Sequence, residues 1–417
     1  MRVWILQTGE PLQIDSENRR AMRAMNLSEA LIARDHDVVV WTSNFDHFSK
    51  AHRYKGARSI DISEKLRIKL IQSCGYKSNV GIKRLLDHAL LGINLRGMLR
   101  SEEIPDIAFV GYPPIEPAWI MTRFLRKAGI PIVLDVKDAW PEVLMRGIPR
   151  RFRYIGRVFL APYFWLGKKS LQNSTYLSSI SPDFLNWALN FENRKIEKFD
   201  TVNLLSNYQI THSESELEEA SRFWDSMGVL DDGAFRVSYI GSIASSLNLD
   251  QVIESARSTS IHFVMAGNGS AFIKTKEKAK HLTNMIFPGW ISTAQASILA
   301  RRSTLLLAPY ANLDDFEMSL PNKFLDAFSH GRPIISSIDG YSRKFIEENN
   351  VGRFYSNNIP SSLTNLLVRL QQSPAEVQFM GNAGRKLFES ELSGEIVYRN
   401  LVQALESIQK ITSNQVM

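Results

Sequence analysis

The sequence predicts an α/β protein made of two doubly wound domains. Near the N-terminus, a buried strand at residues 2–8, a helix with apolar positions within 22–31 and a second strand at 38–42 form a βαβ opening. The same alternation restarts at residues 235–242, where a strand runs into a glycine turn. Residues 317–339 then read as a loop, a short helix and a buried strand, which is one more unit of a parallel sheet. At 417 residues the chain is long enough for two domains, each with its own core.

Further strands complete each half. In the first half, strands at 107–110 and 132–135 are joined by a helix over 118–127. In the second half, strand-to-loop junctions lie at 262–269, 285–290 and 303–310, and residues 360–412 read as helices. The stretch 190–232 is charged and poorly patterned, so we place the interdomain connection near 205–233. We predict an N-terminal domain of residues 1–205 and a C-terminal domain of residues 206–395.

The composition is that of an ordinary globular protein, with 44% hydrophobic and 22% charged residues. The one cysteine, Cys74, rules out an internal disulfide and a multi-cysteine zinc site, and it fits a reducing cytoplasm. The N-terminal residues do not have the layout of a signal peptide, and no apolar run approaches the roughly 18–20 residues that span a bilayer. We therefore expect a soluble or peripheral protein.

The net charge of +7 is unevenly distributed. Residues 1–200 contain 31 Lys and Arg against 21 Asp and Glu, a balance of +10, whereas the remainder contains 19 against 22, a balance of −3. The N-terminal half thus carries the whole basic excess. This predicts an anionic partner for that half: lipid headgroups, a diphosphate-linked acceptor or nucleic acid.

The short helix predicted within 317–339 carries the strongest candidate site. It begins at Pro321-Asn322, with Lys323 in its first turn and Asp326 one turn further on. Ligands of such sheets bind at the carboxyl ends of the strands, and a helix N-terminus offers backbone N–H groups to an anion. Lys323 would suit a diphosphate and Asp326 a ribose diol. The alternative is an ordinary helix N-terminus with solvated charges.

This stretch resembles the donor-site motif of the family 4 glycosyltransferases of GT-B fold, in which two acidic residues precede Ala-x-x-x-Gly-x-Pro. Asp326 falls on the second acidic position, whereas Met318 occupies the first and Glu317 is one residue out of register. The form Pro321-Asn322-Lys323-x-x-Asp326 is similar to a branch that builds bacterial surface polysaccharides such as capsule and O-antigen. The resemblance implies two Rossmann-like domains facing a cleft, and a last helix, residues 396–417, that crosses back to the N-terminal domain.

The resemblance also implies further donor-binding residues. In the wider family the turn after the first strand of the C-terminal domain carries two cations, but here the turn reads Gly241-Ser242 and offers only N–H groups and a hydroxyl. Lys323 is then expected to carry more of the charge compensation. Asn268 lies in the next glycine turn, and Trp290 is expected to cover a uracil base.

The N-terminal half is similar to the same branch in two places. The first begins at Gly9-Glu10 and continues through Arg20 and Arg23. The second is the pattern Asp-x-x-Asp-x-Trp-Pro, which contains Asp138 and Trp140. All these residues are implied acceptor contacts. Asp138 would orient the acceptor hydroxyl or accept its proton, and Trp140 would either stack on a sugar ring or pack in the core.

No metal or other cofactor is expected. Asp35-His36-Asp37 has the form of the metal-binding Asp-x-Asp of other glycosyltransferases, but it falls on a helix-to-strand turn, and we interpret it as structural. The N-terminal βαβ unit also lacks a Gly-x-Gly-x-x-Gly fingerprint, which argues against dinucleotide binding there.

The segment 146–169 interleaves basic and aromatic residues and contains no acidic residue. Arg150, Arg151, Arg153 and Trp165 are the residues that we expect to contact an anionic membrane surface, since basic side chains and aromatic rings both favour the headgroup region. Nucleic acid would use the same side chains, yet no known binding motif accompanies them. A second basic stretch, 53–100, contains leucines at helical spacing, and it fits a membrane interface and a helix facing its own core equally well.

Together these features predict a retaining, metal-independent glycosyltransferase. It would move a sugar, of the HexNAc type, from a UDP-sugar to a lipid-diphosphate-linked saccharide at the inner face of the cytoplasmic membrane. Asp138 and Lys323 are the predicted catalytic residues. Two alternatives stay open: a UDP-sugar 2-epimerase of the same fold, and a non-catalytic nucleotide-binding protein.

Overall fold

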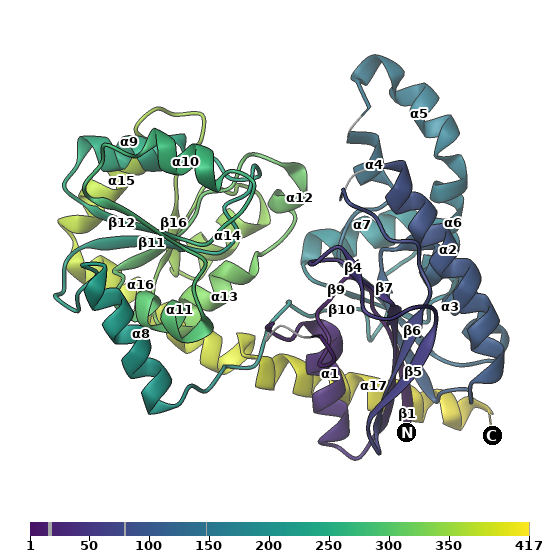
Figure 1. Cartoon of the computed structure of the whole chain (residues 1–417). Coiled ribbons are helices and arrows are strands. Elements are labelled where there is room, and N and C mark those ends of the chain that lie inside the picture. The colour runs from purple at the N-terminus through teal and green to yellow at the C-terminus, as the bar shows by residue number, and fades with distance from the viewer. Residues whose placement is uncertain (16–18, 79–80, 147, 417) are drawn as a thin grey trace. The chain divides into compact units, whose positions relative to one another are not determined.

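The computed structural model describes the chain apart from residues 16–18, 79–80, 147 and 417. It divides into two compact units, each built on its own sheet (Figure 1). Unit 1 comprises Met1–Asn207 and Gly394–Met417, and unit 2 comprises Tyr208–Ser393. Both sheets are mainly parallel and covered by helices, which confirms the predicted α/β class.

Unit 1 contains an eight-stranded sheet of order β10-β9-β8-β7-β1-β2-β6-β5. All neighbouring strands are parallel except β5 and β6, which are antiparallel. The strands are β1 (Arg2–Leu6), β2 (Asp37–Ser43), β5 (Arg58–Ser63), β6 (Leu66–Ile71), β7 (Ile107–Tyr112), β8 (Ile132–Val136), β9 (Tyr176–Ser179) and β10 (Thr201–Val202), and a separate pair is formed by β3 (Phe45–Asp46) and β4 (Ala51–His52). The central strands β7 and β8 are buried along their whole length, as strands covered on both faces should be.

The helices of unit 1 include the C-terminal helix of the chain. They are α1 (Arg23–Ile32), α2 (Ile82–Met98), η1 (Leu99–Ser101), α3 (Ile115–Lys127), α4 (Glu142–Arg146), η2 (Arg150–Phe152), α5 (Arg153–Phe159), α6 (Ala161–Asn173), α7 (Pro182–Glu192) and α17 (Gly394–Val416). Helix α17 packs against α1 (Figure 1). The Tyr398 hydroxyl of α17 donates to the Ser206 carbonyl (2.7 Å), and Arg34 after α1 donates to Glu406 at 2.9 and 2.8 Å. These contacts tie the end of the chain to unit 1.

Unit 2 contains a six-stranded parallel sheet of order β13-β12-β11-β14-β15-β16. Its strands are β11 (Arg236–Ile240), β12 (His262–Ala266), β13 (Met285–Gly289), β14 (Leu305–Ala308), β15 (Ile334–Ser336) and β16 (Gly352–Phe354). Its helices are α8 (Glu214–Ser226), α9 (Asp250–Ser258), α10 (Phe272–Lys278), α11 (Thr293–Arg301), α12 (Asp314–Glu317), α13 (Asn322–Ser329), α14 (Tyr341–Glu348), α15 (Ser362–Gln371) and α16 (Pro374–Leu387), followed by the π-helical turn η3 (Phe388–Leu392).

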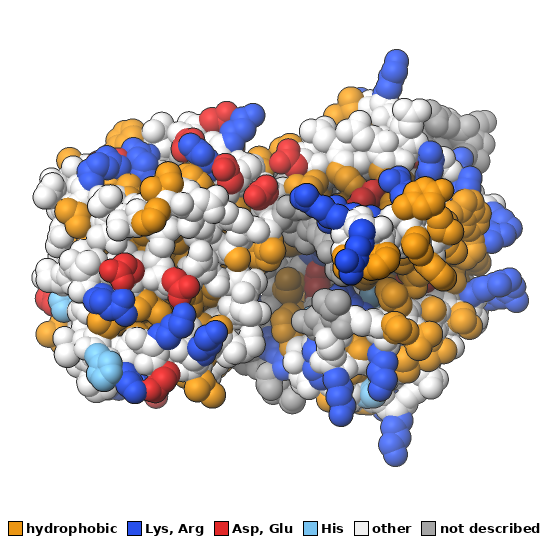
Figure 2. Space-filling model, turned by 90° about the horizontal axis from the view of Figure 1, so that it is seen from above, with side chains coloured by type: hydrophobic (Ala, Val, Ile, Leu, Met, Phe, Trp, Pro, Cys, Tyr) orange, Lys and Arg blue, Asp and Glu red, His pale blue; other side chains and the backbone are white. Residues whose placement is uncertain are grey.

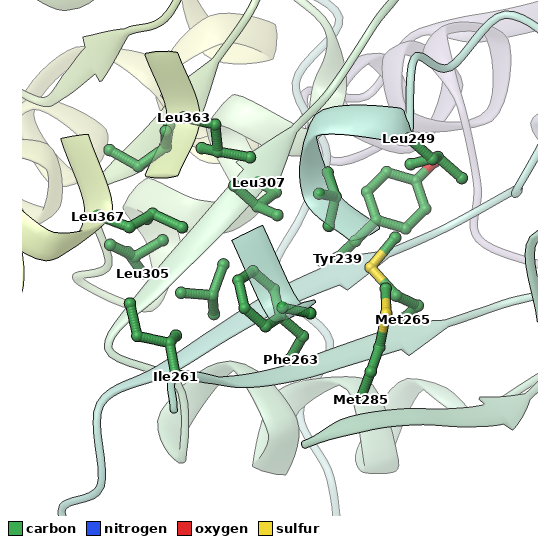
Figure 3. Packing of buried hydrophobic residues seen from close by; sticks show 14 of the residues in the cluster. Tyr239, Leu249, Ile261, Phe263, Met265, Met285, Leu305, Leu307, Leu363 and Leu367 are labelled. Carbon is green, nitrogen blue, oxygen red and sulfur yellow. The ribbon is translucent and has the colours of Figure 1, made fainter. Parts of the chain in front are cut away.

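Both faces of the unit 2 sheet are covered because its strands alternate two apolar sets. One set, which includes Tyr239 and Phe263, packs under Leu363 and Leu367 of α15 (Figure 3). The other set includes Val264 and packs against residues of α8 and α11. Tyr239 lies one residue before the end of β11, so this core also fixes the turn that follows the strand.

The interdomain connection is shorter than predicted. Residues 205–233 were expected to link the domains, but α8 occupies much of this range and belongs to unit 2. Trp224 is fully buried, and its indole N–H donates to the Gln295 carbonyl at 2.8 Å. The helix begins with a capping box formed by Ser213 and Glu216. The charged residues of this range thus form the solvent face of a packed helix.

The basic stretch 53–100 folds into the β5–β6 hairpin and helix α2. On α2, Leu91 and Leu95 are buried in unit 1, which agrees with an amphipathic helix that faces its own core. Ile82 and Ile93 on the same helix are exposed. One more correction is local: the first strand ends at Leu6 rather than at residue 8.

A buried carboxyl group in unit 1 should make stability depend on pH. Glu116 of α3 is 8% exposed, and burial raises its pKa to about 7, a shift that the Tyr163 hydroxyl opposes. Because the pKa of Glu116 is higher in the folded than in the unfolded state, its contribution to the free energy of unfolding is most favourable below about pH 4.5. This contribution is lost as the pH rises to about 7. We expect Glu116→Gln to remove this loss of about 3 kcal/mol. Urea unfolding at pH 5 and pH 8 measures it; an equal pH dependence in both proteins would contradict the expectation.

Candidate functional site

Three turns meet at the carboxyl edge of the unit 2 sheet, after β11, β12 and β13. The Gly241 N–H donates to the Ala266 carbonyl (2.9 Å), and the Gly267 N–H donates to the Gly289 carbonyl (2.7 Å). Gly267 has a φ of 134°, and a Cβ there would lie 1.8 Å from the Gly241 carbonyl oxygen. Only glycine permits this approach, so the turns meet backbone to backbone. Such turns can present N–H groups to an anion.

Lys323 brings an ammonium group to the first of these turns. Its Nζ donates to the Ile240 carbonyl (2.5 Å) and lies 4.5 Å from the centre of the Tyr239 ring. Burial lowers the pKa of Lys323 to about 8, and the nearby Asp326 opposes this shift. A Cβ at Gly241 would lie 1.8 Å from Nζ, so the ammonium group occupies space that only a glycine leaves open. The structure therefore brings together the predicted residues Gly241 and Lys323.

Helix α13 positions Lys323 and Asp326 as the sequence predicted. Pro321 is the N-cap residue and Asn322 begins the helix; both are partly buried. The apolar positions of the helix are buried in unit 2: Phe324, Leu325, Ala327 and Phe328. Burial, and secondly the charge of Asp326, raise the pKa of Tyr310, so Asp326 and Tyr310 lie close to each other. The helix N-terminus, one cation and one carboxylate thus share the carboxyl edge of the sheet.

The remaining predicted donor residues lie at the rim of this edge. The Ser242 carbonyl accepts a hydrogen bond from the Tyr239 hydroxyl (2.6 Å), and the side chain of Ser242 is exposed. The Asn268 carbonyl accepts from the Ile243 N–H (3.0 Å), which links the first and second turns. Trp290 directly follows β13 and is 75% exposed, so its ring is available to a ligand.

Glu317, the acidic residue that is one position out of register with the motif, does not lie on helix α13. Glu317 ends α12, and its carbonyl oxygen would lie 2.5 Å from a Cβ at Gly340. Gly340 has a φ of 67°, a conformation that favours glycine, so this contact fixes Glu317 against the turn before α14. Met318 occupies the first acidic position of the motif and brings no charge.

Two of the predicted acceptor contacts are internal to unit 1. The Glu10 carboxylate accepts hydrogen bonds from the Ala24 N–H (2.8 Å) and the Lys137 ammonium (2.7 Å), and Glu10 is 5% exposed. Arg23 is 1% exposed and donates to the Asn203 carbonyl at 2.5 Å. In this structure both side chains join segments of unit 1 that are distant in sequence, and their contact with an acceptor stays a prediction.

Trp140 is likewise a packed residue. It is 4% exposed, its indole N–H donates to the Asp138 carboxylate (3.1 Å), and the Arg84 guanidinium lies 5.3 Å from its ring centre. In this structure the Trp140 ring is packed within unit 1, as the second of its two interpretations expects. Asp138 is partly buried and also accepts from the Ala139 N–H (2.9 Å). Its carboxylate is thus oriented by its own loop.

A pocket of about 170 Å³ lies in unit 1, where the strands β1, β2 and β7 end. Of the predicted acceptor residues, Gly9 lines this pocket. Arg20 is exposed and does not line it. The other lining residues are Thr8, Ser43, Phe45, His47, Tyr76, Arg84, Asp87, His88, Leu91, Pro113 and Pro114. No local sequence pattern marks His47, Tyr76, Arg84 or His88 as site residues, because they come from separate segments and only the folded chain unites them.

Among the residues described, no group of three or more His, Cys, Asp and Glu side chains is arranged to hold a metal ion. Asp35, the first residue of the Asp-x-Asp sequence, has a φ of 66° and forms an ion pair with Lys65. Asp37 begins β2. The turn between α1 and β2 accounts for this sequence in structural terms.

The basic aromatic segment forms an exposed surface on η2, α5 and α6. Large exposed side chains are Phe152 (45%), Tyr154 (82%), Ile155 (52%), Val158 (61%), Phe159 (80%) and Trp165 (54%). Arg150, Arg151, Arg153 and Arg157 lie among them, and all four are exposed. In Figure 2, which looks from above, hydrophobic and basic side chains gather on the right-hand part of the view, which belongs to unit 1. We name these ten residues the α5 surface; Gly147, in the same segment, lies outside the described residues.

No helix in the described part of the chain has the length and apolar character needed to cross a membrane.

Solved structures share the fold of the whole chain. Sucrose-phosphate synthase from Thermosynechococcus elongatus superposes with a TM-score of 0.72 at 13% identity, over 98% of both chains. Anabaena HepE in complex with UDP-glucose gives a TM-score of 0.63 at 12% identity, over 98% of this chain and 100% of that one. UDP-GlcNAc 2-epimerase from Neisseria meningitidis, bound to UDP-GlcNAc, gives 0.58 at 12% identity, over 98% of this chain and 100% of that one. At these identities the likeness shows the fold.

A search of curated protein sequences found no match to the chain. The sequence does, however, match one family model over a third of its length. The matched residues are 235–373, which include the three glycine turns, Lys323 and Asp326, and the family is described as Glycosyl transferases group 1.

Proposed function

We propose that the protein is a retaining, metal-independent glycosyltransferase that takes a sugar from a UDP-sugar. The observation that carries this proposal is the position of Lys323. This residue lies in the first turn of helix α13, and its ammonium group contacts the loop at Gly241. The segment that matches the group 1 glycosyltransferase model contains all parts of this arrangement. The solved structures with UDP-glucose and UDP-GlcNAc support a nucleotide-sugar ligand for this fold.

The donor would bind with its diphosphate at the Gly241 turn. Backbone N–H groups of the turn, the helix N-terminus and Lys323 would together balance the charge that develops on the leaving UDP. Asp326, one turn after Lys323, would accept hydrogen bonds from the ribose hydroxyls, and Trp290 would cover the uracil ring. Because positive charge and N–H donors come from the chain itself, the transfer does not require a metal. A HexNAc sugar is the donor class we propose.

Unit 1 would bind the acceptor, which we propose to be a lipid-diphosphate-linked saccharide used for surface polysaccharide. The basic excess of residues 1–200 supports an anionic acceptor. The α5 surface supports attachment to the inner face of the cytoplasmic membrane, where such an acceptor would be reached, since exposed aromatic rings and arginines favour the headgroup region. Asp138 would orient the acceptor hydroxyl or accept its proton.

The transfer itself is tested by incubating the purified protein with membrane extract and a panel of labelled sugar nucleotides. Label that moves from one UDP-sugar into a lipid fraction is the expected result. Release of no UDP from any donor in the panel would contradict the proposal.

A UDP-sugar 2-epimerase is the second candidate, because the Neisseria meningitidis epimerase shares the fold over nearly the whole chain. The same incubation separates the two functions. An epimerase converts its UDP-sugar without any membrane extract, whereas the transferase needs the acceptor in the extract. The α5 surface favours the transferase, since an epimerase of soluble UDP-sugars has no use for a membrane-binding face.

The lowered pKa of Lys323 should make donor binding depend on pH. In the free protein its pKa is about 8, and a bound diphosphate would favour the charged form. The affinity for UDP is therefore expected to fall as the pH rises above about 8, by up to about tenfold per pH unit. Calorimetric titration of UDP between pH 7 and pH 10 measures this, with Lys323→Met as the variant that should bind weakly and without this slope. A slope that persists in Lys323→Met would assign it to another group.

A further inference from the structure

The pocket of unit 1 has a wall of cationic and imidazole groups that the proposed transfer has not used. Two histidines line it, and each lies next to a cation. Lys50 Nζ is 3.4 Å from His47 Nδ1, and the Arg84 charge acts on both His47 and His88. The Arg84 guanidinium also lies over the Tyr76 ring, at 5.7 Å from its centre. Two cations therefore lie near the pocket: Lys50, in the loop before β4, and Arg84, on α2.

His88 gives an independent indication of a ligand. It lines the pocket, is 4% exposed, and its Nδ1 has no hydrogen-bond partner among the residues described. An imidazole nitrogen that is buried without a hydrogen-bond partner costs free energy, which a ligand atom that reached Nδ1 would recover. His47 differs, because its Nδ1 lies 2.6 Å from the Tyr76 hydroxyl.

Two carboxylates near the pocket, Asp87 and Asp46, accept hydrogen bonds from other groups of unit 1. Asp87 lines the pocket but is 3% exposed, and its Oδ1 accepts from the Gly75 N–H at 2.6 Å. Asp46 accepts from the Arg19 guanidinium at 2.8 Å and from the Ser49 hydroxyl at 2.5 Å. Both carboxylates thus hold neighbouring segments of unit 1 in place.

From this arrangement we infer that the pocket binds a phosphate or diphosphate group, held by Arg84 and Lys50 and by hydrogen bonds from His47 and His88. The inference rests on the proposed function, because it assigns the pocket to the diphosphate of the acceptor. A volume of about 170 Å³ admits such a group, and the apolar lining residues Phe45 and Leu91 would contact what is attached to it. Charge-assisted hydrogen bonds favour this ligand over an uncharged sugar.

Anion binding would also change the two imidazoles. Burial, followed by the cations Lys50 and Arg84, lowers the pKa of His47 to about 4, although Asp46 opposes the shift. Burial, Arg84 and His47 lower the pKa of His88 to about 3. A phosphate between these groups would offset the cations and raise both pKa values. Proton uptake by the imidazoles is therefore a signature that a purely structural role of these residues would not produce.

The test uses the full chain carrying Lys323→Ala, which removes the proposed donor site, and inorganic pyrophosphate as the probe. Calorimetry should show binding that Arg84→Met weakens by about tenfold or more and that Arg84→Lys, which keeps the charge, largely preserves. Nitrogen chemical shifts of the histidine rings at pH 6 should move toward the protonated form when pyrophosphate is added. Thermal unfolding of Arg84→Met checks that the variant is folded, and His88→Phe gives a second variant that fills the same space.

Three further arms distinguish the outcomes. Farnesyl diphosphate that binds more tightly than pyrophosphate would assign the pocket to a lipid-linked diphosphate, and equal affinities would assign it to a free phosphate compound. Pyrophosphate binding that Arg84→Met and His88→Phe both leave unchanged would overturn the inference, as would tighter binding of uncharged glucose. Failure of the transferase proposal is separate: it would show as no turnover of UDP-sugars, whether or not pyrophosphate binds at Arg84.

Discussion

Replacing Lys323 by alanine is expected to lower turnover of the UDP-sugar by about 100- to 1,000-fold, the usual effect of removing one preorganised group that stabilises developing charge. The ammonium group lies against the Gly241 turn, where backbone N–H groups meet the N-terminus of α13. No other lysine or arginine follows Gly241 in the turn, which reads Ser242-Ile243. The chain therefore has little to replace Lys323 when UDP leaves.

Two companion variants locate this effect. Gly241→Ala should cause a comparable loss, because its Cβ would lie 1.8 Å from Lys323 Nζ and would displace the ammonium group. Asp326→Ala should also lower turnover severely, and it should raise KM for the donor if its carboxylate holds the ribose. Lys344→Ala, at a lysine that is 71% exposed on α14 of the same unit, is the matched control and should keep the wild-type rate. Initial rates and urea unfolding of each variant measure activity and fold separately. Wild-type rates in Lys323→Ala and Asp326→Ala would remove the proposed donor site.

Reversing the charge of Arg150, Arg151 and Arg153 to glutamate should release the protein from anionic vesicles. Each basic residue near an anionic surface contributes about 1 kcal/mol, so losing all three attractions predicts partitioning that is about 100-fold weaker. The exposed rings beside these arginines, Tyr154 and Phe159, should remain able to contact the lipid. Sedimentation with vesicles that contain phosphatidylserine measures the effect, and it should diminish at high salt.

The control for this reversal is a second triple variant with the same change in charge. Lys274, Lys276 and Lys280, all exposed on or beside α10 of unit 2, can be reversed to glutamate without touching the α5 surface. This variant should stay bound to the vesicles. Equal release of both triple variants would attribute binding to net charge alone. Unchanged partitioning of the Arg150, Arg151 and Arg153 variant would refute the membrane role, and a loss of nucleic-acid binding instead would identify the partner as nucleic acid.

The fold and the donor helix could be predicted because their signals are local. The alternation of strand and helix, the Pro321 start of α13 and its apolar stripe all lie within short windows of sequence, and the structure confirms them. Helix α8 was predicted to be part of the interdomain connection because most of its residues are charged or polar. Only two of its positions, Ala220 and Trp224, are buried, and α8 packs against α11. A helix with a narrow apolar face gives a weak periodic signal.

The acceptor residues could not be predicted to the same degree, because their environment is set by distant contacts. Glu10 is neutralised by Lys137, which is 127 positions away, and Arg23 meets the Asn203 carbonyl 180 positions away. Nothing in the local sequence of either residue indicates that it is buried. The pocket of unit 1 was missed for the same physical reason: His47 and His88 belong to different elements and face one cavity only after the sheet has formed.

A crystal structure of the protein with UDP tests the central claim most directly. The account predicts that the diphosphate lies within hydrogen-bonding distance of the Gly241-Ser242 backbone and of Lys323 Nζ, with the ribose near Asp326. A UDP molecule bound elsewhere, with Lys323 still donating only to the Ile240 carbonyl, would contradict it.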